Sequence, residues 1–379
     1  MSDDVLDDIL SSPVLLKAIL GIDVLSVPIV HVKKRRRFTY GRSDHYFTSD
    51  WWRLLHADDL NDPRSNNNKI FRRRFRVPVP IFHQIVAMAV QLGFEMQPVD
   101  AIGQRGVPLQ IQILGVLRVL GRDTCFDGIE ELSRASQESH RVFFHKFIGL
   151  FVRRYFHEFV STPTGQRLRS TMKVYRRLGF NGCFGSMDGV HVKWDHCSYV
   201  LSNMCTGKEH FPTLAFNVIV DHNRFIMSVS SVFFGTYNDK TIVKYDDTVD
   251  KLRKKTLFGE RVIYKLRNAN GELIEHDNPY IICDGGYLKL EYLQTMYKHS
   301  SETYTRAWSK RMESVRKDVE CTFGILKSRF RCLRHGIRFH DYNQIESVFH
   351  MCCILHNMIL VHDGLHNRWN ADEGKQIQT

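Results

Sequence analysis

Three acidic residues constrain the fold of this chain more than any other feature. Asp188 lies in the segment FGSMDGVHVKW and Asp284 ends the segment YIICD, and both segments have the apolar composition of buried strands. Glu320 lies in RKDVECTFGILKSRF, a helical pattern rich in Lys and Arg. A carboxylate in an apolar strand is costly unless it is ion-paired or binds a metal. The fold must therefore supply partners for these acids.

The segment around Asp188 alternates as a half-buried strand does. Phe184, Val190, Val192 and Trp194 fall on one face, and Asp188 has the same parity. The pattern predicts that the carboxylate points toward the same side of the sheet as these apolar side chains.

The order of the later patterns predicts the fold class. In chain order we expect two strands joined by a tight turn at Asp221–Asn223, a helix that begins at Asn238 or Asp239 and includes Lys251–Lys255, a strand over 280–283, and helices over 309–334 and 342–361. Three antiparallel strands followed by alternating helices and strands are the layout of an RNase H-like core. We therefore predict an α/β protein with a mixed sheet flanked by helices.

The part of the chain before this core has a helical pattern. IEELSRASQESHRVFFHKFIGLFVRRYF predicts a short helix, a turn, and a longer helix capped by Ser136. This is the pattern of a helix-turn-helix, in which Arg141 or Lys146 would reach DNA, and equally that of a plain helical hairpin. Both interpretations stay open.

We divide the chain into four parts. They are an acidic then basic, partly flexible extension over 1–69, a helical region over 70–178, the core over 179–362 with an inserted hairpin at about 259–278, and a flexible tail over 363–379.

The charge of the chain favours a polyanionic partner. Lys and Arg number 53 against 41 Asp and Glu, which gives a net charge of +12. The run Lys33–Arg37 suits nuclear import or phosphate contacts, and a solvated basic face is the alternative. The candidate DNA-binding residues are Arg72, Arg73, Arg74, Arg141, Lys146, Arg316, Lys327, Arg331 and Arg334.

Cysteine usage and the first residues predict an intracellular protein without a membrane span. The nine cysteines form no CxxC pair, which is typical of a reducing compartment. The start of the chain is acidic, unlike a secretory signal, and the apolar stretch Pro13–Val32 is interrupted by charges. Cys197, Cys205 and His210 lack the spacing of a zinc knuckle.

Carboxylates on a basic protein suggest metal-assisted cutting or joining of nucleic-acid strands. Two hard cations such as Mg²⁺ bind oxygen ligands and hold the attacking and leaving oxygens of a phosphodiester. In this arrangement Asp188 would bridge both ions, Asp284 would hold one, and Glu320 the other. They are the expected metal ligands and catalytic acids.

Two assignments have structural alternatives. Arg316 and Glu320 are spaced as an i,i+4 ion pair, although we favour metal binding for Glu320. Asp239 is either an auxiliary ligand, the true second acid in place of Asp284, or a helix N-cap, and we favour the cap. His356 and Asn357 follow an apolar run and are expected to be hydrogen-bonded polar groups near the core.

Residues 70–360 resemble the PIF/Harbinger transposase superfamily, whose nuclease is of the DDE type. The matching segments are SMDGVHV around Asp188, FGTYNDKTIV around Asp239, CDGGY around Asp284, KDVECTFGILKSRF around Glu320, and MCCILHN at 351–357. Each is modest alone, but five in this order are specific. The chain departs from the family pattern at Cys321, where arginine is more usual, and at Phe234, where proline is often found.

The resemblance implies an RNase H-like fold, Mg²⁺ or Mn²⁺, and cleavage and transfer of double-stranded DNA at transposon ends. It also implies a nuclear location and a Myb-like accessory DNA-binding protein, and by analogy we expect a homodimer. Our functional prediction is a DDE transposase. The alternative is a domesticated, catalytically silent protein that binds DNA or chromatin.

Overall fold

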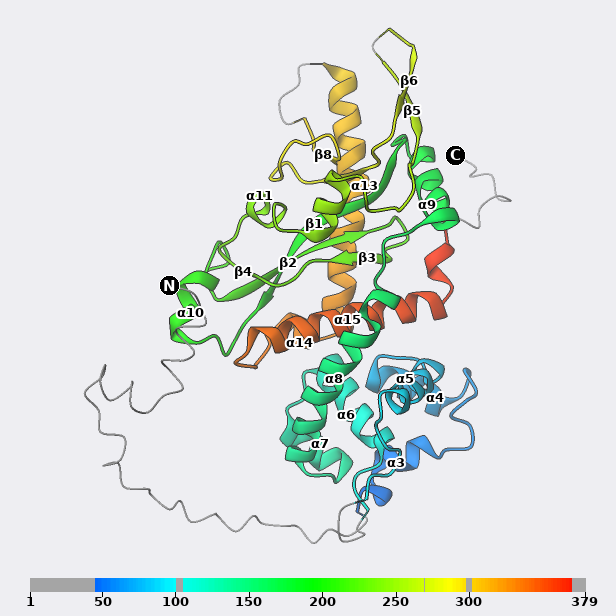
Figure 1. Ribbon diagram of the computed structural model, residues 1–379. Helices are drawn as coiled ribbons and strands as arrows, with labels where there is room; N and C mark the ends of the chain where they lie inside the picture. The colour runs from blue at the N-terminus through cyan, green and yellow to red at the C-terminus, as the bar shows by residue number, and fades with distance from the viewer. Residues whose placement is uncertain (1–44, 100–104, 269, 298–301, 370–379) are drawn as a thin grey trace, which may run out of the picture. The chain divides into compact units, whose positions relative to one another are not determined.

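A mixed six-stranded sheet forms the centre of the computed structural model (Figure 1), which describes residues 45–99, 105–268, 270–297 and 302–369. The strand order is β3-β2-β1-β7-β8, with β4 paired to β2. β1 pairs antiparallel with β2, whereas β7 pairs parallel with β1. The bounds are β1 Cys183–Lys193, β2 Thr213–Val220, β3 Ile226–Val229, β4 Phe233–Phe234, β7 Tyr280–Cys283 and β8 Leu293–Gln294.

The predicted strands occur in the expected order, but the second strand of the predicted hairpin is divided into β3 and β4, both of which pair with β2. The turn that begins at Asp221 joins β2 and β3 as an antiparallel hairpin. The predicted insertion is also a hairpin, formed by β5 (Tyr264–Arg267) and β6 (Leu273–His276) as a separate two-stranded sheet. The chain is thus mixed α/β, with a mixed sheet flanked by helices.

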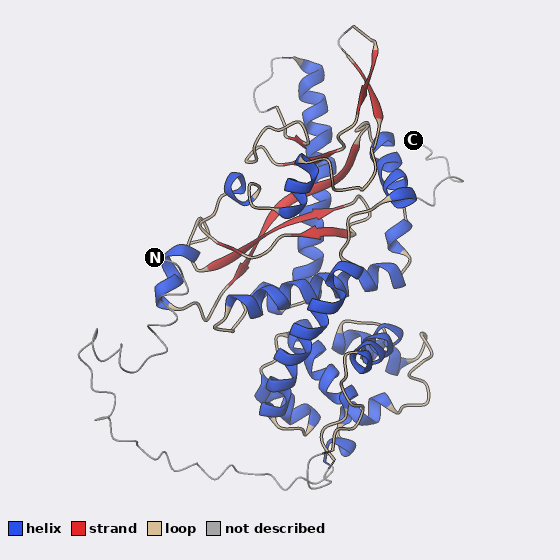
Figure 2. Cartoon of the chain, in the orientation of Figure 1, coloured by secondary structure: helices blue, strands red, loops and turns tan. Residues whose placement is uncertain are grey.

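Helices cover both faces of the sheet (Figure 2). One face packs through Val190 and Val192 into a core that includes Val319 on α13 (Thr303–Arg329). The other face packs into a second core with α9 (Gly165–Arg177) and α12 (Asp247–Arg253). Asp188 has the parity of Val190 and therefore belongs to the α13 face of β1.

Phe184 does not share that face, contrary to the prediction from alternation. It is fully buried in the second core, where its ring lies 5.1 Å from that of Phe258. The register of β1 against β7 shifts between Cys183 and Gly185, and this irregularity changes the parity of the strand before Asp188.

The region before the sheet is helical, as predicted. Its helices are α3 Asp50–Leu55, α4 Asn66–Phe75, α5 Val79–Gln91, α6 Leu109–Arg122, α7 Phe126–Ser133 and α8 Gln137–Phe159, after a short 3₁₀ turn at His45–Thr48. The Ser136 hydroxyl accepts a hydrogen bond from the backbone N–H of Ser139, which confirms the predicted cap of α8.

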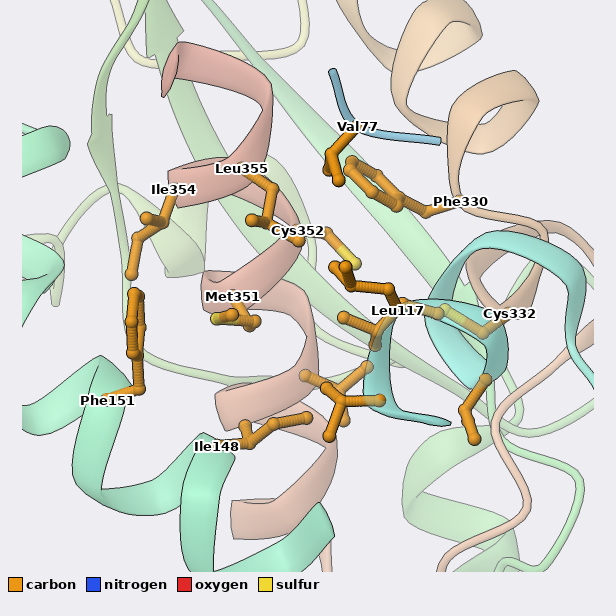
Figure 3. Packing of buried hydrophobic residues seen from close by; sticks show 14 of the residues in the cluster. Val77, Leu117, Ile148, Phe151, Phe330, Cys332, Met351, Cys352, Ile354 and Leu355 are labelled. Atoms are coloured by element: carbon orange, nitrogen blue, oxygen red, sulfur yellow. The ribbon is translucent and has the colours of Figure 1, made fainter. Parts of the chain in front are cut away.

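The helical region and the sheet share one hydrophobic core. Figure 3 shows Phe151 of α8 beside Ile354 of α15 (Tyr342–His362), and Leu117 of α6 near Cys352. The division of the chain between residues 178 and 179 stays a prediction. Residues 69 and 70, between which we divided the chain, both lie inside α4.

Two helix predictions need correction, and the first of them, the helix expected over 309–334, begins earlier, at Thr303. α13 ends at Arg329 because Phe330 is extended and buried, and its ring packs against Val77 (Figure 3). Arg331 precedes a separate short helix, α14 (Cys332–His335), which contains Arg334. The helix expected from Asn238 to Lys255 is two helices, α11 (Asp239–Ile242) and α12, because Asp246 accepts from two backbone N–H groups and starts the second.

α15 matches its predicted bounds and lies in the core. Among the described residues it is the one helix long and apolar enough to cross a membrane, but 72% of its most apolar window is buried. Asn357 accepts from the backbone N–H of Ile226 and donates to the carbonyls of Ile226 and Phe159. The prediction that Asn357 is a hydrogen-bonded polar group near the core is confirmed. The basic run Lys33–Arg37 and the acidic start lie outside the described residues.

Candidate functional site

Asp188 lies in the middle of β1, opposite Val218 of β2. One carboxylate oxygen, Oδ1, accepts from the backbone N–H of Gly189 at 2.9 Å. The other, Oδ2, accepts from the Nη1 of Arg316 at 3.0 Å. The strand acid therefore has a cationic partner on α13, as its burial requires.

Arg316 connects Asp188 to two acids of its own helix. Its Nη2 donates to Glu313 Oε1 at 3.0 Å and to Glu320 Oε1 at 2.6 Å. Its side chain is only 7% exposed. The ion pair that we considered as the alternative for Glu320 is thus present. The prediction that Arg316 contacts DNA does not fit this placement, because its guanidinium is enclosed by three carboxylates.

Asp284 and Asp239 lie together beside this cluster. Asp284 follows β7, the parallel neighbour of β1, and Asp239 is the first residue of α11. A β-carbon placed on Gly286 would lie 2.9 Å from Asp239 Oδ2 and 3.5 Å from Asp284 Oδ2. A β-carbon on Gly189 would lie 3.3 Å from Asp239 Oδ1. The two glycines therefore leave room for the carboxylates.

Asp239 is not the helix cap that we favoured. Asn238 caps α11, since its side-chain oxygen accepts from the backbone N–H of Thr241 at 2.9 Å. The Asp239 carboxylate is thereby left to face Gly189 and Gly286. The sequence could not separate the two because neighbouring Asn and Asp are both good caps. We define the acid cluster as Asp188, Asp239, Asp284, Glu313 and Glu320.

The electrostatics of the cluster reflect burial and crowding. Burial raises the pKa of Asp188 to about 6. Arg316 and the Gly189 N–H lower it, while Asp239 and Asp284 raise it further. Burial alone would lower the pKa of Arg316, but its hydrogen bond to Glu313 and the charges of Asp188, Glu313 and Glu320 raise it. The charged form of Arg316 is thus stabilised by its carboxylate partners, whereas burial and the neighbouring acids disfavour the charged form of Asp188.

Glu313 is a member of the cluster that the sequence reasoning did not assign to the site. Its Oε1 accepts from Arg316, and its Oε2 is buried without a hydrogen-bond partner among the described residues. The sequence feature that could have identified Glu313 is its spacing. It lies three residues before Arg316 and seven before Glu320, which places all three side chains on one face of α13.

The acid cluster has the donor chemistry of a hard-cation site, because all its side-chain ligands are carboxylate oxygens. The buried, unpartnered Oε2 of Glu313 is an observation in favour of that fit. As placed, however, no three His, Cys, Asp or Glu side chains in the described parts of the chain surround a common metal position. Arg316 accounts for this, since its guanidinium lies between Asp188 and Glu320.

The predicted DNA-binding residues are dispersed over four helices and a connecting turn. Lys327 is on α13 and donates to the carbonyl of His191 at 3.1 Å, and burial lowers the pKa of its amine. Arg331 and Arg334, beyond the end of α13, are exposed. Contacts to DNA by these three residues stay predictions.

The α8 candidates have local partners. Arg141 pairs with Glu138 at 2.7 Å, and the Lys146 amine lies 5.5 Å from the centre of the Phe94 ring. Both side chains lie opposite a buried row of phenylalanines, as in any packed amphipathic helix. DNA binding by a helix-turn-helix of α7 and α8 therefore stays a prediction.

The three arginines of α4 differ in their surroundings. Arg72 pairs with Asp363 at 2.5 Å. Arg73 is exposed, whereas Arg74 is half-buried and its backbone carbonyl accepts from Arg118. Arg72 and Arg73 are thus open to solvent on a surface that lies beside α13.

Comparison with known proteins identifies the family. Residues 157–367, which include the whole acid cluster, match the family of plant transposon proteins. The chain is 24% identical over 322 residues to Protein ALP1-like from Arabidopsis thaliana, covering 82% of this chain and 75% of that protein. No solved structure matches it. Because the family match spans more than half of its residues, the chain belongs to the plant transposon proteins, a PIF/Harbinger-derived, transposase-like family.

Proposed function

We propose that this protein is a metal-dependent DNA nuclease of the DDE transposase type, which cleaves and joins strands at transposon ends. The observation that carries the proposal is the meeting of acids from distant segments. Asp188 lies beside Asp239 and Asp284 on one side and is bound through Arg316 to Glu320 on the other. Such crowding of carboxylates is unfavourable without cations, so it points to a functional site.

We propose Asp188, Asp284 and Glu320 as the ligands of two Mg²⁺ or Mn²⁺ ions, with Asp239 as an auxiliary ligand. Bound there, the cations would supply an activated water or 3′ hydroxyl and neutralise the charge of the phosphodiester. Arg316 holds Asp188 and Glu320 close together and balances part of their charge. The glycines at 189 and 286 keep the space beside Asp239 and Asp284 free of side chains.

An RNase H-like core is part of this proposal. It is supported by three antiparallel strands followed by a strand parallel to the first, with the acids on the first strand, after the parallel strand and on the next long helix. Double-stranded DNA as substrate, a Myb-like accessory protein, a homodimer and a nuclear location are proposed from the family resemblance.

A cleavage assay tests the proposal. Purified protein is incubated with supercoiled plasmid and Mg²⁺ or Mn²⁺, and nicked and linear products are measured. Asp188→Asn, Asp284→Asn and Glu320→Gln should each lower the rate by about 100-fold or more, as the loss of a metal ligand does. Asp247→Asn, which neutralises an exposed acid on α12, is the matched control and should retain the rate. Equal cleavage by the acid variants and the control would refute the site.

The alternative, a catalytically silent DNA-binding protein, is favoured by one observation. A guanidinium lies between Asp188 and Glu320, where cations would otherwise bind. Titration calorimetry with Mn²⁺ separates the two functions. A nuclease should bind Mn²⁺, and Asp188→Asn should abolish this binding. A silent protein should bind DNA, and its heat of Mn²⁺ titration should be the same in the wild type and in Asp188→Asn.

A further inference from the structure

A basic pocket borders α13 just after Glu320, since Cys321 and Gly324 are among the residues that line it. It is a cavity of about 1130 Å³ between α4, the turn after β2, α13 and α15. Six cationic residues line it, and they come from three separate parts of the chain: Lys69, Arg72, Arg73, Arg76, Arg224 and Arg329. Only Arg72 and Arg73 were among the residues that the sequence suggested for DNA binding.

The charge of the pocket is poorly compensated. None of the described residues that line it is Asp or Glu. Asp363 at its edge pairs with Arg72, and one nitrogen of Arg76, its Nε, is buried without a hydrogen-bond partner among the described residues. Cations gathered around a cavity of this size create a strongly positive potential, which attracts a polyanion.

Gly324 leaves the surface of α13 between Glu320 and this pocket without a side chain. It lies on α13 one turn after Glu320 and lines the pocket together with Cys321. A β-carbon placed on Gly324 would meet no atom within 4 Å. Packing therefore does not require glycine here, although glycine inside a helix costs about 1 kcal/mol relative to alanine. A ligand that lies along this face of α13 would account for a glycine at position 324.

We propose that the basic pocket binds the sugar-phosphate backbone of a DNA strand that runs from the acid cluster over Gly324; this inference rests on the proposed nuclease function. Nine residue steps of helix separate Glu320 from Arg329, and at about 100° per step the two side chains lie on opposite sides of α13, so the axial rise of about 13.5 Å is the smallest distance between them. This corresponds to about four nucleotides of a B-form strand. The pocket thus binds phosphates that lie about four nucleotides or more from the scissile one. Its cations recognise backbone, not base sequence.

The first test measures DNA binding by fluorescence anisotropy in EDTA, where cleavage cannot occur. Arg73→Gln combined with Arg224→Gln should remove two phosphate contacts and lower the salt slope of log K by about 1.8. Between about 50 and 200 mM salt, the wild type should then lose about 12-fold more affinity than this variant. Arg153→Gln combined with Arg176→Gln removes the same charge from exposed positions of α8 and α9. Equal effects of the two double variants would overturn the proposal.

The second test adds bulk without removing charge. Gly324→Leu should fold with unchanged or higher melting temperature, yet lower the DNA affinity by about tenfold or more by blocking the path. Gly149→Leu on α8 is the matched control, because a β-carbon there also meets nothing within 4 Å. Wild-type binding by Gly324→Leu would overturn the proposal. The proposal would also be overturned if the pocket bound inorganic polyphosphate but neither the Arg73→Gln and Arg224→Gln double variant nor Gly324→Leu changed DNA binding.

These measurements separate the two proposals. A protein that shows the pocket-dependent salt slope but never cleaves plasmid would refute the nuclease and keep the pocket. A protein that cleaves through Asp188 but binds DNA independently of Arg73, Arg224 and Gly324 would refute the pocket alone.

Discussion

Replacement of Arg316 by Met tests how the acid cluster is held together. Arg316→Met keeps most of the side-chain volume and removes the cation that pairs with Asp188, Glu313 and Glu320. Removing one partner of a buried ion pair costs about 3–5 kcal/mol. The side chains of Arg316 and Asp188 are 7% and 21% exposed. Glu320 is 45% exposed, so solvent weakens its ion pair with Arg316. We therefore expect a loss near the lower limit, about 3 kcal/mol.

The loss should depend on pH. Burial already raises the pKa of Asp188 to about 6, and Arg316 lowers that pKa, so the variant raises it further. A carboxyl whose folded pKa exceeds its unfolded value binds more protons when folded, so the folded state gains stability as the pH falls. The destabilisation of Arg316→Met should thus be smaller at pH 5 than at pH 8.

Urea unfolding in EDTA, followed by tryptophan fluorescence, measures both effects. Arg311→Met is the matched control on α13, because Arg311 is exposed and its Nε donates to the carbonyl of Leu178. In a separate series without EDTA, Mn²⁺ should restore part of the lost stability, about 2.7 kcal/mol at 100 times its dissociation constant. A role of Arg316 in holding the acids together is refuted if Arg316→Met is no more destabilising than Arg311→Met, or if its destabilisation is equal at both pH values.

The remaining predictions concern acid stability and the start of α11. Burial lowers the pKa values of His140, His350 and His356 to about 4, so the stability that each contributes is present above pH 6.5 and is lost as the pH falls toward 4. The urea midpoint of His140→Asn should accordingly vary less between pH 6.5 and 4 than that of the wild type; equal variation would contradict the assignment. Asn238→Ala should cost about 1 kcal/mol of stability through the lost cap and retain cleavage, whereas Asp239→Asn should retain stability and lose cleavage. The opposite pattern, measured by thermal unfolding and plasmid nicking, would return Asp239 to a structural role.

Local patterns predicted the elements well where one principle dominated. The strands around Asp188 and before Asp284, the inserted hairpin at about 259–278 and the cap at Ser136 are confirmed because alternation, turn chemistry and capping act over a few residues. α13 was predicted to end five residues too late. Its basic pattern continues past Arg329, but burial of Phe330 against Val77, far away in the sequence, ends the helix.

Asp188, Asp284 and Glu320 could be recognised from their local patterns as acids that need partners, and their motifs identified the family. Which partners they have depends on the packing of elements that are distant in the chain. A guanidinium that looked like a DNA contact on the surface of a helix is buried among three acids, because α13 packs on the face of β1 that carries Asp188. Likewise, the basic pocket joins residues 69–76, 224 and 329, which no local pattern connects. Charges separated by more than a hundred residues acquire an energy only when the fold brings them within a few ångströms.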